Sequence, residues 1–309
     1  MQTNKQYRLL TRSDLDGLVC AVLLGHLDLV EDIVLIDSPG SMSAGEVEVR
    51  PDDITANLPY VPGVHLCFDH HVSETIRNRP ASGYIIDPDA PSAARVVYEY
   101  YGGKNTFPVF FNDIMAAVDK ADSGDFTIDE ILHPSGWPLL NFLVDTRTRI
   151  EEWGNFDIDE TAFKRRLIDL MGKHPVRDIM ETPDVRQRAD VYFEYEKKYK
   201  EQLSAIVQII GNIAVFDLRR IARFYPGNRF IIYALYPECN LSIQIKQEKE
   251  NNITTFSVGK SIINKTATVN IGELMYAYGG GGHRAAGACH VDNDAADRVF
   301  EEIVQKLTA

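Results

Sequence analysis

Apolar and polar positions along the first half of the chain follow the pattern of strands separated by helices. Short apolar runs typical of buried strands occur at 7–11, 32–37 and 63–68, and strand-like alternation occurs at 46–49. Helical patterns occur at 16–27, 92–102 and 109–125, the last opening on the strand-like run 109–111. Strands interleaved with helices predict an α/β fold, whose N-terminal parallel sheet carries helices on both faces.

The pattern changes in the second half. Residues 186–208 contain no Gly or Pro and are rich in helix formers, which predicts a long helix linking two domains. Strand-like runs follow at 212–218, 229–236, 240–247 and 253–259, and a closing helix at 295–307. We therefore expect a domain over 1–185, a linker helix over 186–208 and a smaller C-terminal α/β domain over 209–309.

Composition narrows the choice of partners. The 309 residues carry a net charge of −13, which disfavours a protein that grips long nucleic-acid duplexes. A small phosphorylated substrate or a short single-stranded oligonucleotide suits this charge better, above all beside bound divalent cations. We expect no membrane segment and a cytoplasmic location, leave a homodimer open, and expect the four cysteines to be buried free thiols.

Candidate metal ligands follow two of the predicted strands. Asp14 and Asp16 lie between a strand and a helix, where the alternative is a simple N-cap. His70 and His71 come directly after Asp69 at the end of another strand. Strand ends of a parallel sheet open at one edge, and Asp together with His suits Mn²⁺.

Further acids lie at loop positions of the same predicted domain. Asp119 and Asp122 share a helix face, Asp125 follows Gly124, and Asp52 and Asp53 precede the strand that ends in Asp69. Solvated helix ends also carry such aspartates. So many clusters in one α/β domain are nevertheless hard to explain as caps alone.

Four glycines in a row stand at 279–282. Because glycine loses the most backbone entropy on folding, such a run favours a turn that approaches a ligand closely, with amides facing a phosphate. His283 and Arg284 lie at its mouth. A flexible loop is the alternative, although apolar segments flank the run.

Together these motifs resemble the DHH phosphoesterase family. They are "SDLDG" at 13–17, Asp69–His71, "ADSGD" at 121–125 and "GGGGHRAAG" at 279–287, the last resembling the family's C-terminal DHH-associated domain. The layout looks closest to the nano-RNase and exopolyphosphatase-related group. The resemblance implies hydrolysis of phosphoester or phosphoanhydride bonds in a small nucleotide, a short oligonucleotide or polyphosphate.

The resemblance also implies a pair of Mn²⁺ or Mg²⁺ ions. Asp14 would hold one ion and Asp16 the other, Asp53 would bridge them (Asp52 or Asp37 being alternatives), and His70 and Asp122 would complete the second. His71, with Asp69, would act at the scissile phosphate. The implied substrate-binding residues are those of the glycine-rich turn, Gly280, Gly281, Gly282, His283 and Arg284. In "DTRT" at 145–148, Arg147 is placed where it could pair with a phosphate, and a salt bridge is the alternative.

One position departs from the family pattern. Many members carry histidine two residues before the first aspartate, where this chain has Arg12. Arginine stays protonated and cannot ligate a metal. Three outcomes are open: a single tightly bound ion, direct binding of substrate phosphate by Arg12, or a catalytically impaired protein that still binds a nucleotide or nucleic acid. A purely structural role would leave the aspartates unexplained.

Overall fold

The computed structural model describes residues 5–248 and 252–308. The chain divides into two compact units, Met1–Phe126 with Pro134–Tyr192, and Thr127–His133 with Phe193–Ala309. The division falls inside α10 (Pro183–Ile206), a helix that begins and ends slightly before the predicted 186–208.

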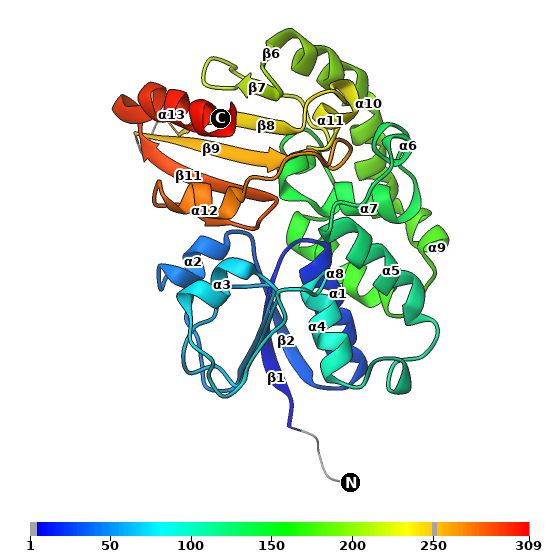
Figure 1. Cartoon of the computed structure of the whole chain (residues 1–309). Coiled ribbons are helices and arrows are strands. Elements are labelled where there is room, and N and C mark those ends of the chain that lie inside the picture. The colour runs from blue at the N-terminus through cyan, green and yellow to red at the C-terminus, as the bar shows by residue number, and fades with distance from the viewer. Residues whose placement is uncertain (1–4, 249–251, 309) are drawn as a thin grey trace. The chain divides into compact units, whose positions relative to one another are not determined.

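The first unit is built on a five-stranded sheet in which every pairing is parallel (Figure 1). The strands run in the order β2-β1-β3-β4-β5. Their bounds are β1 (Tyr7–Arg12), β2 (Val30–Ile36), β3 (Asp53–Ala56), β4 (Leu66–Asp69) and β5 (Tyr84–Ile86). All five carboxyl ends therefore meet at one edge.

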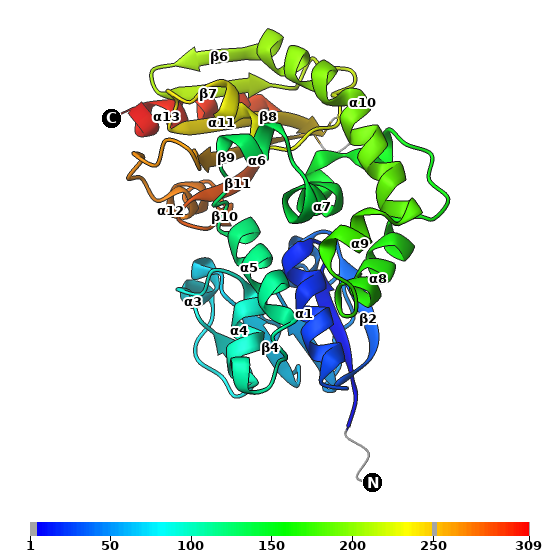
Figure 2. The same ribbon diagram turned by 90° about the vertical axis from the view of Figure 1, so that its right-hand side faces the viewer.

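Helices α4, α5 and α8 pack against α1 beside this sheet, as Figure 2 shows for α4 and α5. Helix α1 is buried along most of its length, which explains its continuous apolar sequence. On the other face, Leu10 and Ile36 pack against Met42 of α2 and Leu58. The helices of this unit are α1 (Leu15–His26), α2 (Pro39–Ser43), α3 (Val72–Arg77), α4 (Ala93–Tyr100), α5 (Phe111–Asp122), α7 (Gly136–Val144), α8 (Glu160–Met171) and α9 (Val176–Met180).

The second unit contains a six-stranded mixed sheet of order β10-β11-β9-β8-β7-β6, in which only β7 and β8 pair in parallel. Helices α12 and α13 cover its apolar core. Its strands are β6 (Val207–Ile210), β7 (Ile213–Asp217), β8 (Leu241–Glu248), β9 (Ile253–Lys260), β10 (Gly281–Gly282) and β11 (Ala286–Asp292). Its helices are α6 (Ile128–Leu132), α11 (Ile231–Leu235), α12 (Ile271–Tyr276) and α13 (Ala296–Thr308), besides the end of α10.

Three predicted strands are wrong. Residues 46–49 are irregular, and the strand of that region is β3, whose residues are all buried and do not alternate. Residues 109–111 lead into α5, and 229–236 contain α11, where the side chain of Asn228 accepts from the amide of Phe230. Short apolar runs fit a strand or a buried helix equally well.

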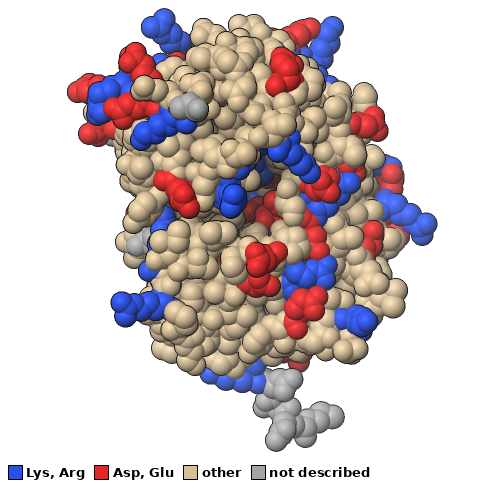
Figure 3. Space-filling view, viewed as in Figure 1, with Lys and Arg blue, Asp and Glu red and all other residues tan. Residues whose placement is uncertain are grey.

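The predicted α/β class, with a parallel sheet in the first unit and a smaller second α/β unit, is confirmed, and the sheet of the second unit is mixed. All four cysteines are buried and free. None of the described helices is long and apolar enough to span a bilayer. On the face drawn in Figure 3, lysine and arginine side chains are scattered among acidic ones.

Candidate active site

The carboxyl edge of the five-stranded sheet collects most of the predicted site residues. Arg12 ends β1, Asp69 ends β4, and Asn57 follows β3. Gly17 lets α1 begin directly against β1, because a Cβ there would lie 1.9 Å from the carbonyl oxygen of Arg12. The side chains of the first helical turn are thereby held at this edge.

Asp16 is fixed by the start of another helix. Its two carboxylate oxygens accept the amides of Ala93 and Ala94, the first residues of α4, at 2.9 and 2.8 Å. Burial, followed by the negative charge of Asp122, raises the pKa of Asp16 to about 8. A neighbouring cation would stabilise the ionised form of a carboxylate that is buried beside another acid.

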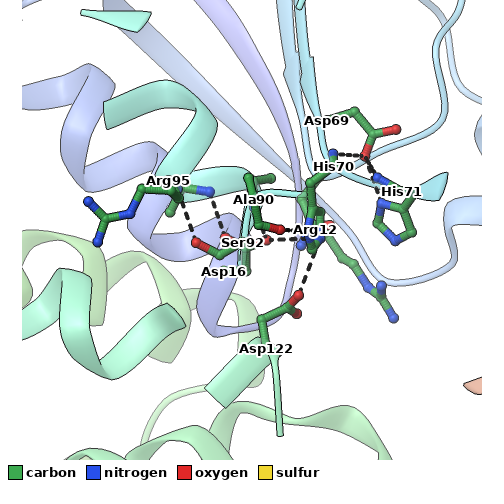
Figure 4. A network of polar contacts seen from close by, with 12 residues as sticks. Arg12, Asp16, Asp69, His70, His71, Ala90, Ser92, Arg95 and Asp122 are labelled. Atoms are coloured by element: carbon green, nitrogen blue, oxygen red, sulfur yellow. Dashed lines mark hydrogen bonds and ion pairs between the residues drawn. The ribbon is translucent and has the colours of Figure 1, made fainter. Parts of the chain in front are cut away.

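His70 faces two acids with a defined nitrogen (Figure 4). Its Nδ1 lies 3.1 Å from the carbonyl oxygen of Ala90, which can only accept, so Nδ1 carries the hydrogen. Nε2 then faces Asp122 at 3.2 Å and Asp16 at 3.9 Å. Burial lowers the pKa of His70, but the two carboxylates outweigh it and raise that pKa.

These three side chains fit a divalent cation. Ligand atoms of Asp16, His70 and Asp122 all lie within 4.8 Å of one another. With Nδ1 protonated and His70 neutral, Nε2 faces two carboxylates as a third acceptor, so the contact is relieved either by a proton, as the raised pKa values of Asp16 and His70 indicate, or by a metal ion. Two carboxylates and an imidazole are ligands that Mn²⁺ and Mg²⁺ accept.

His71 is oriented by Asp69. The carboxylate oxygen Oδ1 of Asp69, which is fully buried, lies 2.6 Å from Nδ1 of His71 and also accepts the amide of His70 at 2.9 Å. His71 remains partly exposed. This pairing leaves Nε2 as the nitrogen of His71 that can act on a ligand.

Asp14 has a different environment from Asp16. One oxygen caps α1 by accepting the amide of Gly17 at 3.1 Å and also accepts Nδ2 of Asn57 at 3.1 Å. The other pairs with Nε of Arg12 at 3.0 Å. The N-cap alternative is thus what the structure has at Asp14.

The structure does not bring Asp53 to this edge, which corrects its assignment as a bridging ligand. Asp53 begins β3, so it lies at the amino end of the strand, opposite Asp14 and His70. Its fully buried carboxylate accepts Nε and Nη2 of Arg8 at 2.8 and 2.7 Å and the amide of Arg50 at 2.7 Å. Asp52 precedes it, and Asp37 follows β2, where it accepts the hydroxyl of Ser13.

The charge of Arg147 interacts with acids at the same edge of the sheet. Burial lowers its pKa, but the carboxylate of Asp145 and, farther off, those of Asp14 and Asp122 raise it overall. Its Nε lies 2.7 Å from Asp145, and about half of its side chain is exposed. Arg147 can therefore meet an anion while Asp145 orients it.

The glycine run of the second unit differs from the predicted amide cradle. The amides of Gly279, Gly280 and His283 donate to Tyr276, Met275 and Ala286 of the same unit. A Cβ at Gly280 would lie 2.0 Å from a backbone oxygen of β11. Gly280 and Gly282 thus serve internal packing, since a Cβ at Gly282 would also lie 2.3 Å from the carbonyl oxygen of Ala286.

Arg284, next to this run, is exposed and has a cationic neighbour that the sequence did not reveal. Burial and the positive charge of Arg284 lower the pKa of Lys260. The amide of Lys260 donates to the carbonyl of Ala285 at 2.8 Å, which holds the backbone of Lys260 beside the residue that follows Arg284. Within 5–248 and 252–308, no carboxylate pairs with either cation.

Sequence reasoning also missed Asn57. Its one signal was that it follows the short segment "ITA" at 54–56, which is too short and too polar to mark a strand end by pattern. An asparagine before "LPY" at 58–60 is typical of an ordinary turn. Nothing in the sequence pairs the amides of Ala93 and Ala94 with Asp16, since they are 77 and 78 residues apart.

A protein of solved structure is similar to this chain over nearly the full length of both. The chain is 45% identical to a pGpG-specific phosphodiesterase, PggH, from Vibrio cholerae, over 98% of this chain and 99% of that one, with a TM-score of 0.79. RecJ from Thermus thermophilus, solved in complex with Mn²⁺, shares the fold at 14% identity and a TM-score of 0.50, over 98% of this chain and 52% of RecJ.

Two other comparisons add little. An A-adding tRNA nucleotidyltransferase from Aquifex aeolicus is 32% identical over 111 residues, which are 33% of this chain and 13% of that protein. The chain therefore spans only a small part of this curated relative. No family model matches the sequence.

Proposed function

Because the chain belongs to the DHH phosphoesterase family, we propose that it is a metal-dependent phosphodiesterase that hydrolyses the linear dinucleotide pGpG. The observation that carries this proposal is the 45% identity to a pGpG-specific phosphodiesterase over 98% of the chain. A short substrate also suits the net charge of −13, which repels long polyanions.

Asp16, His70 and Asp122 would hold the metal ion. When bound there, Mn²⁺ or Mg²⁺ would lower the pKa of a water molecule and neutralise negative charge on the phosphate oxygens. The amides of Ala93 and Ala94 orient the carboxylate of Asp16, and the carbonyl of Ala90 fixes the tautomer of His70.

In the reaction, the oxygen of water attacks the phosphorus of the internal phosphodiester, and the bond from phosphorus to the 3′ oxygen breaks. The departing oxygen takes up a proton, so both products are GMP. We assign the proton transfer to Nε2 of His71, because Asp69 holds Nδ1 and leaves Nε2 as the nitrogen that can exchange a proton with the substrate. Asp69 is a positioning residue in this scheme.

Cationic side chains would bind the substrate phosphates. Arg12 and Arg147 lie near the acids of the first unit. In the second unit, Arg284 and Lys260 form a cationic pair suited to a terminal phosphate, and His283 lies beside them in sequence. A phosphate group relieves the repulsion between two neighbouring cations.

A second candidate is a nucleotide-binding protein without turnover. The ion pair between Arg12 and Asp14 favours it, because this pair occupies the position where the family pattern has a metal ligand. Binding of pGpG without hydrolysis separates the two candidates.

The test is chromatography of nucleotides after incubating the full chain with pGpG, pApA, pAp, a longer oligonucleotide or polyphosphate, in Mn²⁺, Mg²⁺ or EDTA. We expect pGpG to yield GMP fastest, and EDTA to stop the reaction. Tight binding of pGpG by calorimetry with no GMP in either metal would overturn the enzyme and support the binding protein.

A further inference from the structure

We propose that this chain binds one divalent ion where the family pattern implies two, and that the guanidinium of Arg12 replaces the other. The inference rests on the proposed metal-dependent function and specifies its site. It concerns the ligands that the family pattern assigns to the first ion, which do not fit a cation here.

The carboxylate of Asp14 is already engaged. Arg12 pairs with Oδ2 at 3.0 Å, while Oδ1 accepts from Gly17 and Asn57 at 3.1 Å each. A metal ion at Asp14 would have to displace the guanidinium or share the carboxylate with it. The guanidinium of Arg12 thus places a positive charge at Asp14, where the family pattern implies a metal ion.

The bridging acid is replaced by an amide. Asn57 follows β3 at the carboxyl edge, is buried, and has a φ of 56°, a left-handed conformation in which Asn is enriched. Its Nδ2 donates to Asp14, and its buried Oδ1 has no hydrogen-bond partner among the described residues, so the side chain offers a neutral oxygen in place of a carboxylate. Asp53 lies four residues earlier, about 13 Å away along an extended strand.

The group of side chains around Asp16 and the group around Asp14 differ in net charge. Asp16 and Asp122 give −2 with neutral His70, which matches a divalent ion, whereas Asp14, Arg12 and Asn57 sum to zero. Within the described part of the first unit, Asp16, His70 and Asp122 form the one group of three or more His, Cys, Asp or Glu whose ligand atoms lie within 4.8 Å. The group around Asp14 therefore lacks the negative charge of a second divalent site, and its one carboxylate is already paired with Arg12.

The replacement preserves the chemistry that a second cation supplies. A guanidinium neutralises phosphate charge and binds two phosphate oxygens through parallel N–H groups. Arg12 uses Nε for Asp14, and its side chain is 26% exposed. The terminal nitrogens Nη1 and Nη2 make no hydrogen bond to the residues that the structure describes, so they are available to a phosphate.

The test counts ions without substrate. Calorimetry with Mn²⁺, elemental analysis after desalting, and electron paramagnetic resonance are applied to the wild type, Arg12→His, Arg12→His with Asn57→Asp, and Arg12→Gln. We expect one ion in the wild type, with the signal of an isolated Mn²⁺. The double variant should gain a second ion, bound at least about tenfold more tightly than any second ion in the wild type.

Arg12→Gln separates a charge effect from a ligand effect. It removes the guanidinium and adds only a neutral amide oxygen, a weaker metal ligand than the histidine of Arg12→His, so it should keep one ion and lose at least about tenfold in kcat/KM for pGpG. Circular dichroism checks that each variant is folded. If the double variant does not fold, the wild-type ion count decides alone.

The outcomes distinguish this inference from the proposed function. Two tightly bound, exchange-coupled ions in an active wild type would overturn the replacement and leave the phosphodiesterase intact. One ion in a wild type that hydrolyses none of the phosphoesters would support the replacement and overturn the enzyme.

Discussion

Nδ1 of His70 donates to the carbonyl of Ala90 at 3.1 Å, and this contact directs the other ring nitrogen toward the acids. The acceptor is a backbone atom in the loop between β5 and α4, and α4 itself holds Asp16 through its first amides. One short segment thus orients two of the three proposed metal ligands. The site depends on this segment as much as on the ligands themselves.

Replacing His70 by glutamine should abolish tight Mn²⁺ binding and reduce turnover at least about a hundredfold, since even partners of ligands affect affinity by 10–100-fold. Calorimetry and a pGpG assay measure both. His65→Gln is the matched control, because His65 is exposed and stacks on Tyr7 at 4.3 Å. Retained metal in His70→Gln would remove His70 from the ligand set.

Asp69→Asn should lower kcat about a hundredfold or more while leaving Mn²⁺ stoichiometry unchanged. The amide introduced by this substitution cannot accept a charge-assisted hydrogen bond from Nδ1 of His71, and general acid catalysis contributes about 10²–10⁴ in rate. The loss should be much smaller for a substrate whose leaving oxygen needs no proton, such as a nitrophenyl phosphodiester, a difference that a merely structural role would not cause. Equal loss for both substrates, together with a lower melting temperature, would contradict the assignment.

Only some of the proposed metal ligands could be predicted from the sequence pattern alone. Asp16 and His70 could be chosen because each follows an apolar strand, and parallel strands end at one edge. Asp122 depended on the resemblance, because α5 carries Asp119 and Asp122 on one face. Only the structure separates them: Asp119 accepts the hydroxyl of Ser92 at 2.8 Å and pairs with Arg95.

The wrong assignment of Asp53 shows why the other residues of the site could not be predicted from the sequence. A pair of adjacent acids before an apolar run reads as a loop after a strand, and the strand expected at 46–49 strengthened that interpretation. The actual strand β3 has only four residues, and the two ends of so short a strand are not distinguishable by pattern. The partner of Asp53, Arg8, is 45 residues away in sequence.

Asp53→Asn should therefore lower the free energy of unfolding by about 2–3 kcal/mol, because it leaves Arg8 without its charged partner in a largely buried pair. Chemical denaturation measures this loss. Mn²⁺ stoichiometry and kcat should stay at their wild-type values. Asp52→Asn, at the exposed neighbour, is the control and should leave stability unchanged within about 0.5 kcal/mol.

The stability of the metal-free protein should fall as pH rises. Asp16 has a pKa of about 8 in the folded chain, well above its ordinary value, so folding takes up a proton. The stability gained from that proton is complete below about pH 4 and is lost as pH rises through about 8. Mn²⁺ replaces the proton, so its stabilising effect should be largest at high pH.

Melting temperatures in EDTA and in Mn²⁺, from about pH 5 to about pH 9, measure this dependence. The two curves should diverge with rising pH, and Asp16→Asn should remove most of the divergence. A melting temperature in EDTA that rises over the upper half of this range would show that Asp16 is ionised without metal.

The last prediction concerns Lys260 and Arg284 in the second unit. Two neighbouring cations without a carboxylate partner among the described residues repel each other, and Arg284 contributes to the lowered pKa of Lys260. A terminal phosphate bound by both would remove that cost. Lys260→Ala and Arg284→Ala should each raise KM for pGpG about tenfold, or about 1.4 kcal/mol, with kcat and metal content unchanged.

GpG, which lacks the 5′ phosphate, decides whether that phosphate is the group recognised. Both variants should hydrolyse GpG with the wild-type KM, because the contact they remove is absent from this substrate. Arg298→Ala is the matched control, since Arg298 is exposed and pairs with Glu302 at 2.7 Å, and it should alter neither substrate's KM. Equal increases in KM for pGpG and GpG would assign Lys260 and Arg284 to another part of the dinucleotide, and no increase for either would exclude them from substrate binding.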